Sequence, residues 1–175
     1  TYSVAWIDCL ASGDNMGRSL VSIGEHAHTG ELKAGKPPTL SVPCTLPAWL
    51  LNKHSIQAFN ELYYQKTLKD VATSRVHYDP FFYPLDGIGS WNKLYGKNGF
   101  LQYQFVLPME NGREGLTQIL QKIATSRKGS FLAVLKAFGK GNENLLSFPE
   151  EGYTLALDFK WQADLLPFLD ELDAI

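Results

Sequence analysis

Five polar side chains interrupt three otherwise apolar segments in the second half of the chain: Gln102, Gln104, Lys136, Thr154 and Asp158. Amides, a hydroxyl, an ammonium group and a carboxylate among apolar neighbours are the groups that orient a ligand in an apolar pocket. In this interpretation Lys136 binds an anionic or hydroxylated ligand and pairs with Asp158. Binding rather than bond breaking is expected, because the sequence contains no recognisable Ser-His-Asp or Cys-His arrangement and no GxGxxG motif.

Two further patterns carry less information. His26 and His28 would lie on the same side of a strand, but no third ligand for a metal is evident, which favours a surface pair. Residues 139–142 (GKGN) lack the GxxxxGK[ST] pattern of a phosphate loop and are typical of a turn between strands. The sequence therefore predicts no metal site and no phosphate loop.

The elements that must position the polar residues follow from the apolar periodicity after residue 100. Alternation over residues 100–107, 131–138 and 153–159 predicts three strands, and helical spacing over 113–127 and 165–172 predicts two helices. Their order, strand, helix, strand, strand, helix, is five sixths of a ferredoxin-like βαββαβ unit, whose sixth strand we expect after Ile175. The predicted fold class is α+β, with an antiparallel sheet and helices on one face.

Each of the three strands has one wholly apolar face, which suits packing on the two helices. The opposite face carries the five polar residues among apolar ones: Phe100, Val106, Leu132, Val134 and Phe138. This face is either solvated, with Lys136 extending along an edge strand, or covered as a ligand pocket or domain interface. So many apolar side chains are unfavourable in water, which favours the covered alternative.

The first half is less regular. Residues 2–9 and 18–24 predict two strands paired as a hairpin, and residues 54–66 predict an amphipathic helix. Between them, residues 33–47 are rich in Gly, Pro, Lys and Thr, which predicts a loop.

The composition is that of a globular protein: 175 residues, 45% hydrophobic, with 16 basic and 18 acidic side chains for a net charge of -2. This balance argues against nucleic-acid binding, and no apolar stretch is long enough to span a bilayer. Cys9 and Cys44 form no disulfide framework, which favours a reducing cytosol. Because the chain opens at Thr1 without methionine and closes at Ile175 within a helical pattern, we expect a piece of a longer polypeptide.

Several segments resemble, in order, the FAD-dependent decaprenylphosphoryl-β-D-ribose 2'-oxidase family. The longest are residues 81–88 (FFYPLDGI), 91–96 (WNKLYG) and 99–108 (GFLQYQFVLP). Shorter ones are residues 2–8 (YSVAWID), 17–18 (GR), 59–60 (FN), 63–64 (YY), 130–132 (SFL), 136–139 (KAFG), 146–149 (LSFP) and 155–159 (LALDF). The resemblance covers nearly the whole chain except residues 33–47.

The family is similar to the vanillyl-alcohol-oxidase group, in which an N-terminal domain binds FAD and a second domain covers the flavin and forms the substrate pocket. The resemblance implies that residues 1–175 are a substrate-binding domain, that FAD is bound mainly by an N-terminal domain outside this chain, and that the isolated chain is inactive. It also implies a lipid-linked or other sugar substrate, oxidised by hydride transfer to flavin, and a partner NAD(P)H-dependent reductase. The expected location is the cytoplasm, peripheral at the inner membrane, with membrane association only through the lipid substrate.

The resemblance also implies a set of pocket residues, matched position by position: Trp6, Leu85, Trp91, Gln102, Gln104, Leu132, Val134, Lys136, Phe138 and Asp158. Thr154 stands where family members carry asparagine. The family's lysine nearest the flavin falls beyond residue 175, so no catalytic residue is expected in this chain. The alternatives are a sugar-lactone oxidase domain and a free-standing ferredoxin-like binding or regulatory module.

Overall fold

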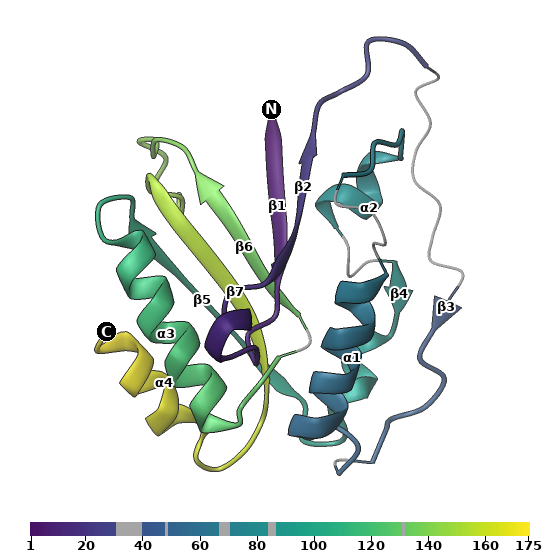
Figure 1. Ribbon diagram of the computed structural model, residues 1–175, viewed down its shortest axis with the longest axis vertical. Coiled ribbons are helices and arrows are strands. Elements are labelled where there is room, and N and C mark those ends of the chain that lie inside the picture. The colour runs from purple at the N-terminus through teal and green to yellow at the C-terminus, as the bar shows by residue number, and fades with distance from the viewer. Residues whose placement is uncertain (31–39, 48, 67–70, 84–86, 131) are drawn as a thin grey trace.

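The computed structural model describes residues 1–30, 40–47, 49–66, 71–83, 87–130 and 132–175. Within these residues a five-stranded sheet has the order β2-β1-β6-β7-β5, with neighbouring strands antiparallel (Figure 1). The strands are β1 (Tyr2–Ile7), β2 (Ser19–Gly24), β5 (Phe100–Pro108), β6 (Ala133–Phe138) and β7 (Gly152–Lys160). The predicted α+β class with an antiparallel sheet is thus confirmed.

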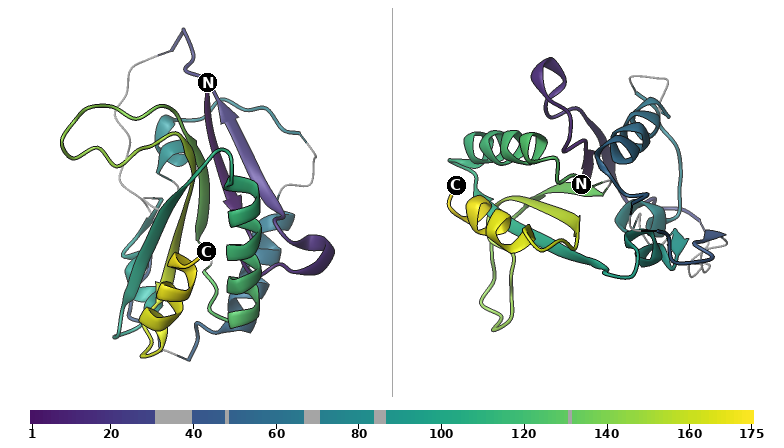
Figure 2. Two further views of the ribbon diagram at one scale, coloured as in Figure 1. Left: turned by 90° about the vertical axis from the view of Figure 1, so that its left-hand side faces the viewer. Right: turned by 90° about the horizontal axis from the view of Figure 1, so that it is seen from below.

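Two helices, α3 (Gly112–Ser126) and α4 (Leu165–Asp173), lie on one face of this sheet (Figures 1 and 2). The side chains beneath them are those that strand alternation assigns to the apolar face. Leu155 and Leu157 of β7 are fully buried, and the ring of Phe159 meets that of Phe168 on α4 edge to face, with centroids 5.9 Å apart. The main hydrophobic core lies between these helices and the sheet.

The order of elements from residue 100 is the predicted one, β5-α3-β6-β7-α4. β7 lies between β5 and β6 because it follows β6 in an antiparallel pair and also pairs with β5 over its whole length. The ferredoxin-like assignment stays a prediction, since its sixth strand would follow the last residue of the chain. The predicted hairpin of β1 and β2 is confirmed, and β1 also pairs with β6.

The other face of the sheet carries smaller elements from the first half of the chain (Figure 2, right). These are α1 (Lys53–Gln65), α2 (Tyr78–Phe82), the 3-10 helix η2 (Trp91–Tyr95), and β3 (Leu40–Ser41) paired in parallel with β4 (Ile88–Gly89); a further 3-10 helix, η1 (Gly13–Asn15), lies in the β1–β2 connection. Helices therefore occupy both sides, whereas sequence periodicity predicted them on one. Residues 33–39 of the predicted loop lie outside the described residues. Leu40 and Ser41 form a short strand, which was not predicted because prolines lie on both sides of it.

Helix α1 begins at a strong local signal. The Asn52 side chain accepts hydrogen bonds from the backbone N–H groups of His54 and Ser55, at 2.9 and 3.2 Å, and the Ser55 hydroxyl accepts from the Asn52 backbone N–H at 3.0 Å. This reciprocal cap satisfies donors that the first helical turn leaves free. From this start, Ile56, Asn60 and Tyr63 follow at spacings of four and three on the side of the helix that faces the sheet.

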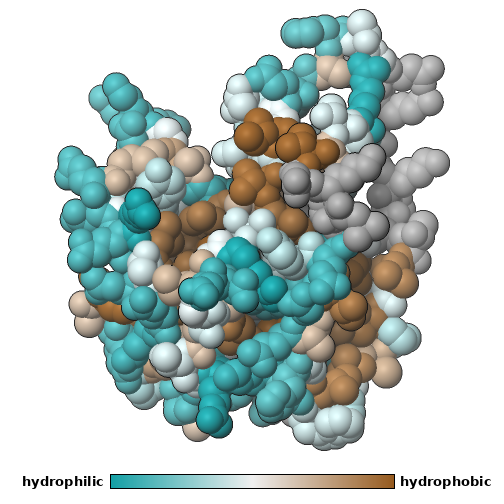
Figure 3. All heavy atoms as spheres, in the orientation of Figure 1, coloured by the Kyte–Doolittle hydropathy of each residue, from teal (hydrophilic) through white to brown (hydrophobic). Residues whose placement is uncertain are grey.

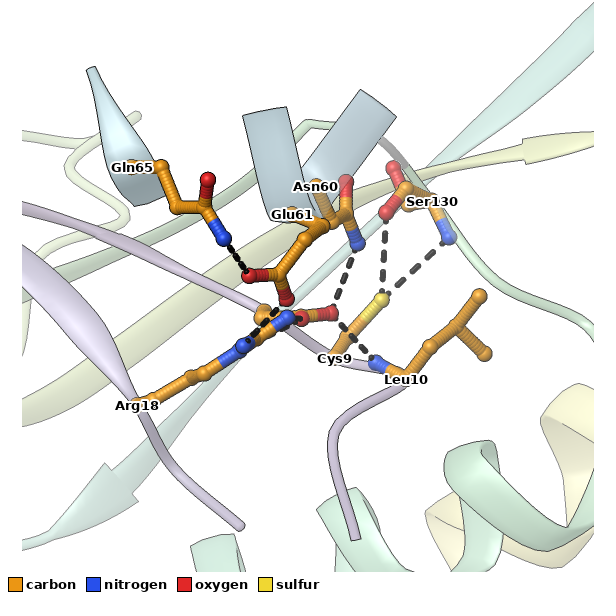
Figure 4. Close-up of polar contacts among 8 residues, drawn as sticks. Cys9, Leu10, Arg18, Asn60, Glu61, Gln65 and Ser130 are labelled. Atoms are coloured by element: carbon orange, nitrogen blue, oxygen red, sulfur yellow. Dashed lines mark hydrogen bonds and ion pairs between the residues drawn. The ribbon is translucent and has the colours of Figure 1, made fainter. Parts of the chain in front are cut away.

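A buried carboxylate holds α1 against the sheet (Figure 4). Asp8, which is 2% exposed at the end of β1, accepts hydrogen bonds from Nε and Nη2 of Arg18 at 3.0 and 2.7 Å. Its other oxygen accepts from the Leu10 backbone N–H at 3.0 Å and from Nδ2 of the fully buried Asn60 at 2.7 Å. Arg18 also donates to Glu61 at 2.7 Å, so two residues of α1 join the network. We call Asp8, Arg18, Asn60 and Glu61 the Asp8 clamp.

None of the described helices has the combination of length and apolarity that crossing a bilayer requires.

Replacing Asp8 by alanine tests the clamp. The variant leaves the Asn60 amide buried without its acceptor and deprives Arg18 of its most buried partner, so the free energy of unfolding should fall by about 3 kcal/mol. Chemical denaturation measures this, with Asp14→Asn, an exposed carboxylate of the same hairpin, as the control that should leave stability unchanged. Equal stability of Asp8→Ala and the parent chain would show that the clamp contributes nothing.

Candidate functional site

The strand register brings the five predicted polar residues to one face. Gln102 stands opposite Asp158, and Lys136 stands opposite Thr154. Gln104 stands opposite Ala156, which lies between Thr154 and Asp158 on the same side of β7. Residues directly opposite each other in a sheet point to the same side. The face that alternation predicts as polar and apolar together is therefore a single surface, which we call the mixed face.

Two of the amides are bound to the strand beside them. Nε2 of Gln102 donates to Oδ1 of Asp158 at 3.1 Å, and Nε2 of Gln104 donates to Oγ1 of Thr154 at 3.0 Å. Both glutamines are exposed on the outermost strand β5, whereas Thr154 and Asp158 are 1% exposed. The amides thus provide hydrogen-bond partners for two buried side chains.

Lys136 stands apart from these pairs. Its side chain is half-buried, and within the described part of the chain its ammonium group takes part in no hydrogen bond or ion pair. The predicted pairing of Lys136 with Asp158 is wrong, because the register places Lys136 opposite Thr154, four residues before Asp158 on β7. A cation without a partner on a partly apolar surface can bind an anionic or hydroxylated ligand.

Apolar residues of the predicted set lie beside these polar side chains on the mixed face. Trp6 of β1 stands opposite Val134, which stands opposite Ala156, so an apolar row crosses three strands of the mixed face. Leu132, just before β6, and Phe138, at its end, are both half-buried, and the Phe138 ring meets Phe148 edge to face. The row of Trp6, Val134 and Ala156 separates Lys136 from the pair formed by Gln102 and Asp158.

The first half of the chain covers the margins of the mixed face. Tyr63 of α1 lies on Trp6, with ring centroids 4.8 Å apart, and leaves Trp6 8% exposed. At the other margin Trp91 and Tyr95 of η2 pack on Phe100, with centroids 4.9 and 4.6 Å apart. Trp6 and Asp158 are therefore buried by this chain itself rather than left open. The middle of the face, with Lys136 and Gln104, remains accessible.

Of the predicted pocket residues, Leu85 lies outside the described residues, and the other nine lie on the mixed face or at its margins. The sequence predicts an amphipathic helix over residues 54–66, which contains Tyr63, but it assigns neither Tyr63 nor Tyr95 to the site. Helical periodicity marks Tyr63 as inward-facing but does not say against which surface. Tyr95 belongs to a short 3-10 helix that gives no periodic signal.

Asp158 has an unusual environment for a carboxylate. Burial raises its pKa to about 6, although the hydrogen bond from Gln102 lowers it. Its Oδ2 is buried and accepts no hydrogen bond within the described residues. Burial also raises the pKa of the Tyr95 hydroxyl, and the nearby charge of Asp158 adds to this. A buried carboxylate with a raised pKa is typical of a functional site.

Other candidate groups are less suited to chemistry. Cys9 is buried, and its thiol donates to the Ser130 carbonyl at 3.2 Å (Figure 4). Burial raises the pKa of this thiol to about 12, although the bond to Ser130 opposes the shift, so the thiolate nucleophile is absent near neutral pH. A hollow of about 430 Å³ between α1 and the β1–β2 connection is lined by Arg18, but Asp8 and Glu61 already neutralise that charge.

The chain is similar in sequence to part of an oxidase. No family model matches it. The decaprenylphosphoryl-β-D-ribose oxidase of Mycolicibacterium smegmatis is 38% identical over 184 aligned residues, which cover 99% of this chain and 39% of that protein. The predicted resemblance is thus confirmed, and the alignment is consistent with a C-terminal segment of that oxidase family. The chain spans well under half the length of the curated relative it matches.

Asp158→Asn tests whether the buried carboxylate is held at a cost. Because its pKa is raised from 3.8 to about 6, the folded chain holds a proton in that interval which the unfolded chain has released. Stability should therefore fall as pH rises from about 4 to about 6, and the variant should lack this fall. Above pH 6 it should exceed the parent by about 1 to 3 kcal/mol.

Thermal or urea unfolding at pH 4 and pH 7 measures this difference. Asp170→Asn, an exposed carboxylate on α4, is the matched control and should behave as the parent does at both pH values. If Asp158→Asn is no more stable than the parent at pH 7, the carboxylate is not strained in the folded chain.

Proposed function

We propose that this chain is the substrate-binding part of an FAD-dependent oxidoreductase that oxidises a hydroxyl group of a lipid-linked sugar. The observation that carries the proposal is the mixed face, where Lys136 is half-buried beside an apolar row and, among the described residues, has no hydrogen-bond or ion-pair partner. The relative from Mycolicibacterium smegmatis, whose name states a decaprenylphosphoryl-ribose substrate, supports this substrate class. A free-standing binding module receives less support, because 99% of the chain aligns with part of an oxidase.

Different residues of the mixed face would bind different parts of such a substrate. The ammonium group of Lys136 attracts a phosphate by its charge. It can also donate three hydrogen bonds, which suits the oxygens of a sugar phosphate. Gln104 presents an amide at the open edge of β5, where it can donate to or accept from a sugar hydroxyl. Val134 and Ala156 form the apolar surface between them, which excludes water from the bound ring.

On the same face, Val134 and Ala156 offer small apolar side chains that suit contact with a flat ring such as that of a flavin, while Lys136 and Gln104 serve the substrate. When bound, FAD supplies the acceptor for the hydride that leaves the sugar carbon. This chain's residues orient the sugar and keep the site dry, and FAD would be held mainly by sequence outside the chain. A partner NAD(P)H-dependent reductase would then reduce the ketone product.

Removing the Lys136 charge in the longer FAD-containing protein tests the proposal. Lys136→Met keeps the apolar stem but loses the ammonium group, so KM for the polyprenylphosphoryl sugar should rise at least tenfold, about 1.4 kcal/mol of lost binding. Steady-state kinetics measure this. Lys140→Met, an exposed lysine just past β6, should leave the kinetics unchanged. Unaltered kinetics of Lys136→Met would show that Lys136 does not bind the substrate.

A further inference from the structure

One side of α1 exposes apolar side chains that the Asp8 clamp does not use. The helix directs Ile56, Asn60 and Tyr63 toward the sheet, and Glu61 toward Arg18. Phe59 and Leu62, three residues apart, therefore share the flank that points away from Arg18. Leu62 is 72% exposed and Phe59 is 44% exposed. We call this stripe the α1 flank.

The α1 flank is continuous with the mixed face. Phe59 stacks on Tyr63, with centroids 5.9 Å apart, and Tyr63 lies on Trp6 at 4.8 Å. Trp6 in turn stands opposite Val134 in the sheet. An unbroken series of aromatic contacts thus leads from the exposed helix stripe to the apolar row that crosses β6 and β7.

Two lysines lie beside this path: Lys136, two residues after Val134 on the same side of β6, and Lys66. Lys66, which follows α1, places its ammonium group 3.5 Å from the centre of the Tyr63 ring. As far as the structure describes the chain, neither Lys66 nor Lys136 forms an ion pair. The path therefore suits a molecule with a phosphate at one end and a long apolar chain. Apolar residues also reach the surface over α2 and beside α1 on the side of the molecule drawn in Figure 3.

We propose that the α1 flank binds the first isoprene units of the polyprenyl chain of the substrate, with Leu62 and Phe59 as the contacts. The proposal rests on the proposed function, which supplies a substrate whose phosphate lies at the mixed face. The prenyl chain must leave that face across a margin, and on the side of α1 this margin is formed by Tyr63 and Phe59, which lie over the buried Trp6. A flat stripe on one helix is also too narrow for a stable protein interface, which needs roughly 800 Å² from each partner.

Calorimetric titration of the 175-residue chain with two probes tests this proposal. Farnesyl phosphate carries three isoprene units and dimethylallyl phosphate carries one, and both are used below the concentration at which they form micelles. Farnesyl phosphate should bind at least tenfold more tightly to the parent chain. Leu62→Gln, which adds no charge that would repel phosphate, should reduce this advantage at least fivefold and leave the affinity for dimethylallyl phosphate unchanged.

The matched control is Leu166→Gln, an exposed leucine of α4 on the other face of the sheet, which should keep the full advantage of the longer chain. Equal affinity of the parent chain for the two probes, or an advantage that persists in Leu62→Gln, would overturn the proposal but not the proposed function. If neither probe binds the parent chain, the proposed function fails with it. Loss of binding to anionic phospholipid vesicles in Leu62→Gln, without a chain-length advantage in the parent, would assign the flank to a membrane and also overturn the proposal.

Discussion

The buried carboxylate of Asp8 fixes helix α1 on the sheet, and the arrangement of the mixed face follows from this contact. It lies at the end of β1, is 2% exposed, and binds both the Arg18 guanidinium and the Asn60 amide of α1. An uncompensated charge at this depth would be strongly destabilising, so α1 is held where both Arg18 and Asn60 reach the Asp8 carboxylate. That position brings Tyr63 onto Trp6, which sets one margin of the mixed face.

The two faces of the sheet contribute to the protein in different ways. The face under α3 and α4 buries leucines and phenylalanines and supplies the hydrophobic stabilisation of the fold. The mixed face buries Thr154 and Asp158 and keeps Lys136 half-exposed, which stabilises the fold less than apolar residues would. Polar groups retained at a cost to stability are expected where a ligand must be bound, because function and stability often compete at such sites.

The division of the strands into two faces was predictable from the sequence, because alternation needs only local order along each strand. It placed Gln102, Gln104, Lys136 and Asp158 on one surface, as the register confirms. Which residues stand opposite each other was not predictable, because register depends on pairing between distant segments. The predicted Lys136 and Asp158 pair failed for this reason.

Contacts between distant segments also explain what the sequence left out. Asn60 meets Asp8 across 52 positions of sequence, and no local pattern marks that contact. The position of α1 on the second face follows from it, as does the role of Tyr63. Tyr95 was missed because its 3-10 helix is too short for a periodic pattern, and it is buried by stacking on Phe100.

We expect a ligand to bind the mixed face and not the face covered by α3 and α4. Mapping amide chemical shifts of the ¹⁵N-labelled chain during titration with a polyprenyl phosphate tests it most directly. The resonances of the Val134, Lys136 and Ala156 amides should shift together, while those of α3 and α4 should not move. Shifts confined to α3 and α4, with the strand amides unmoved, would contradict it.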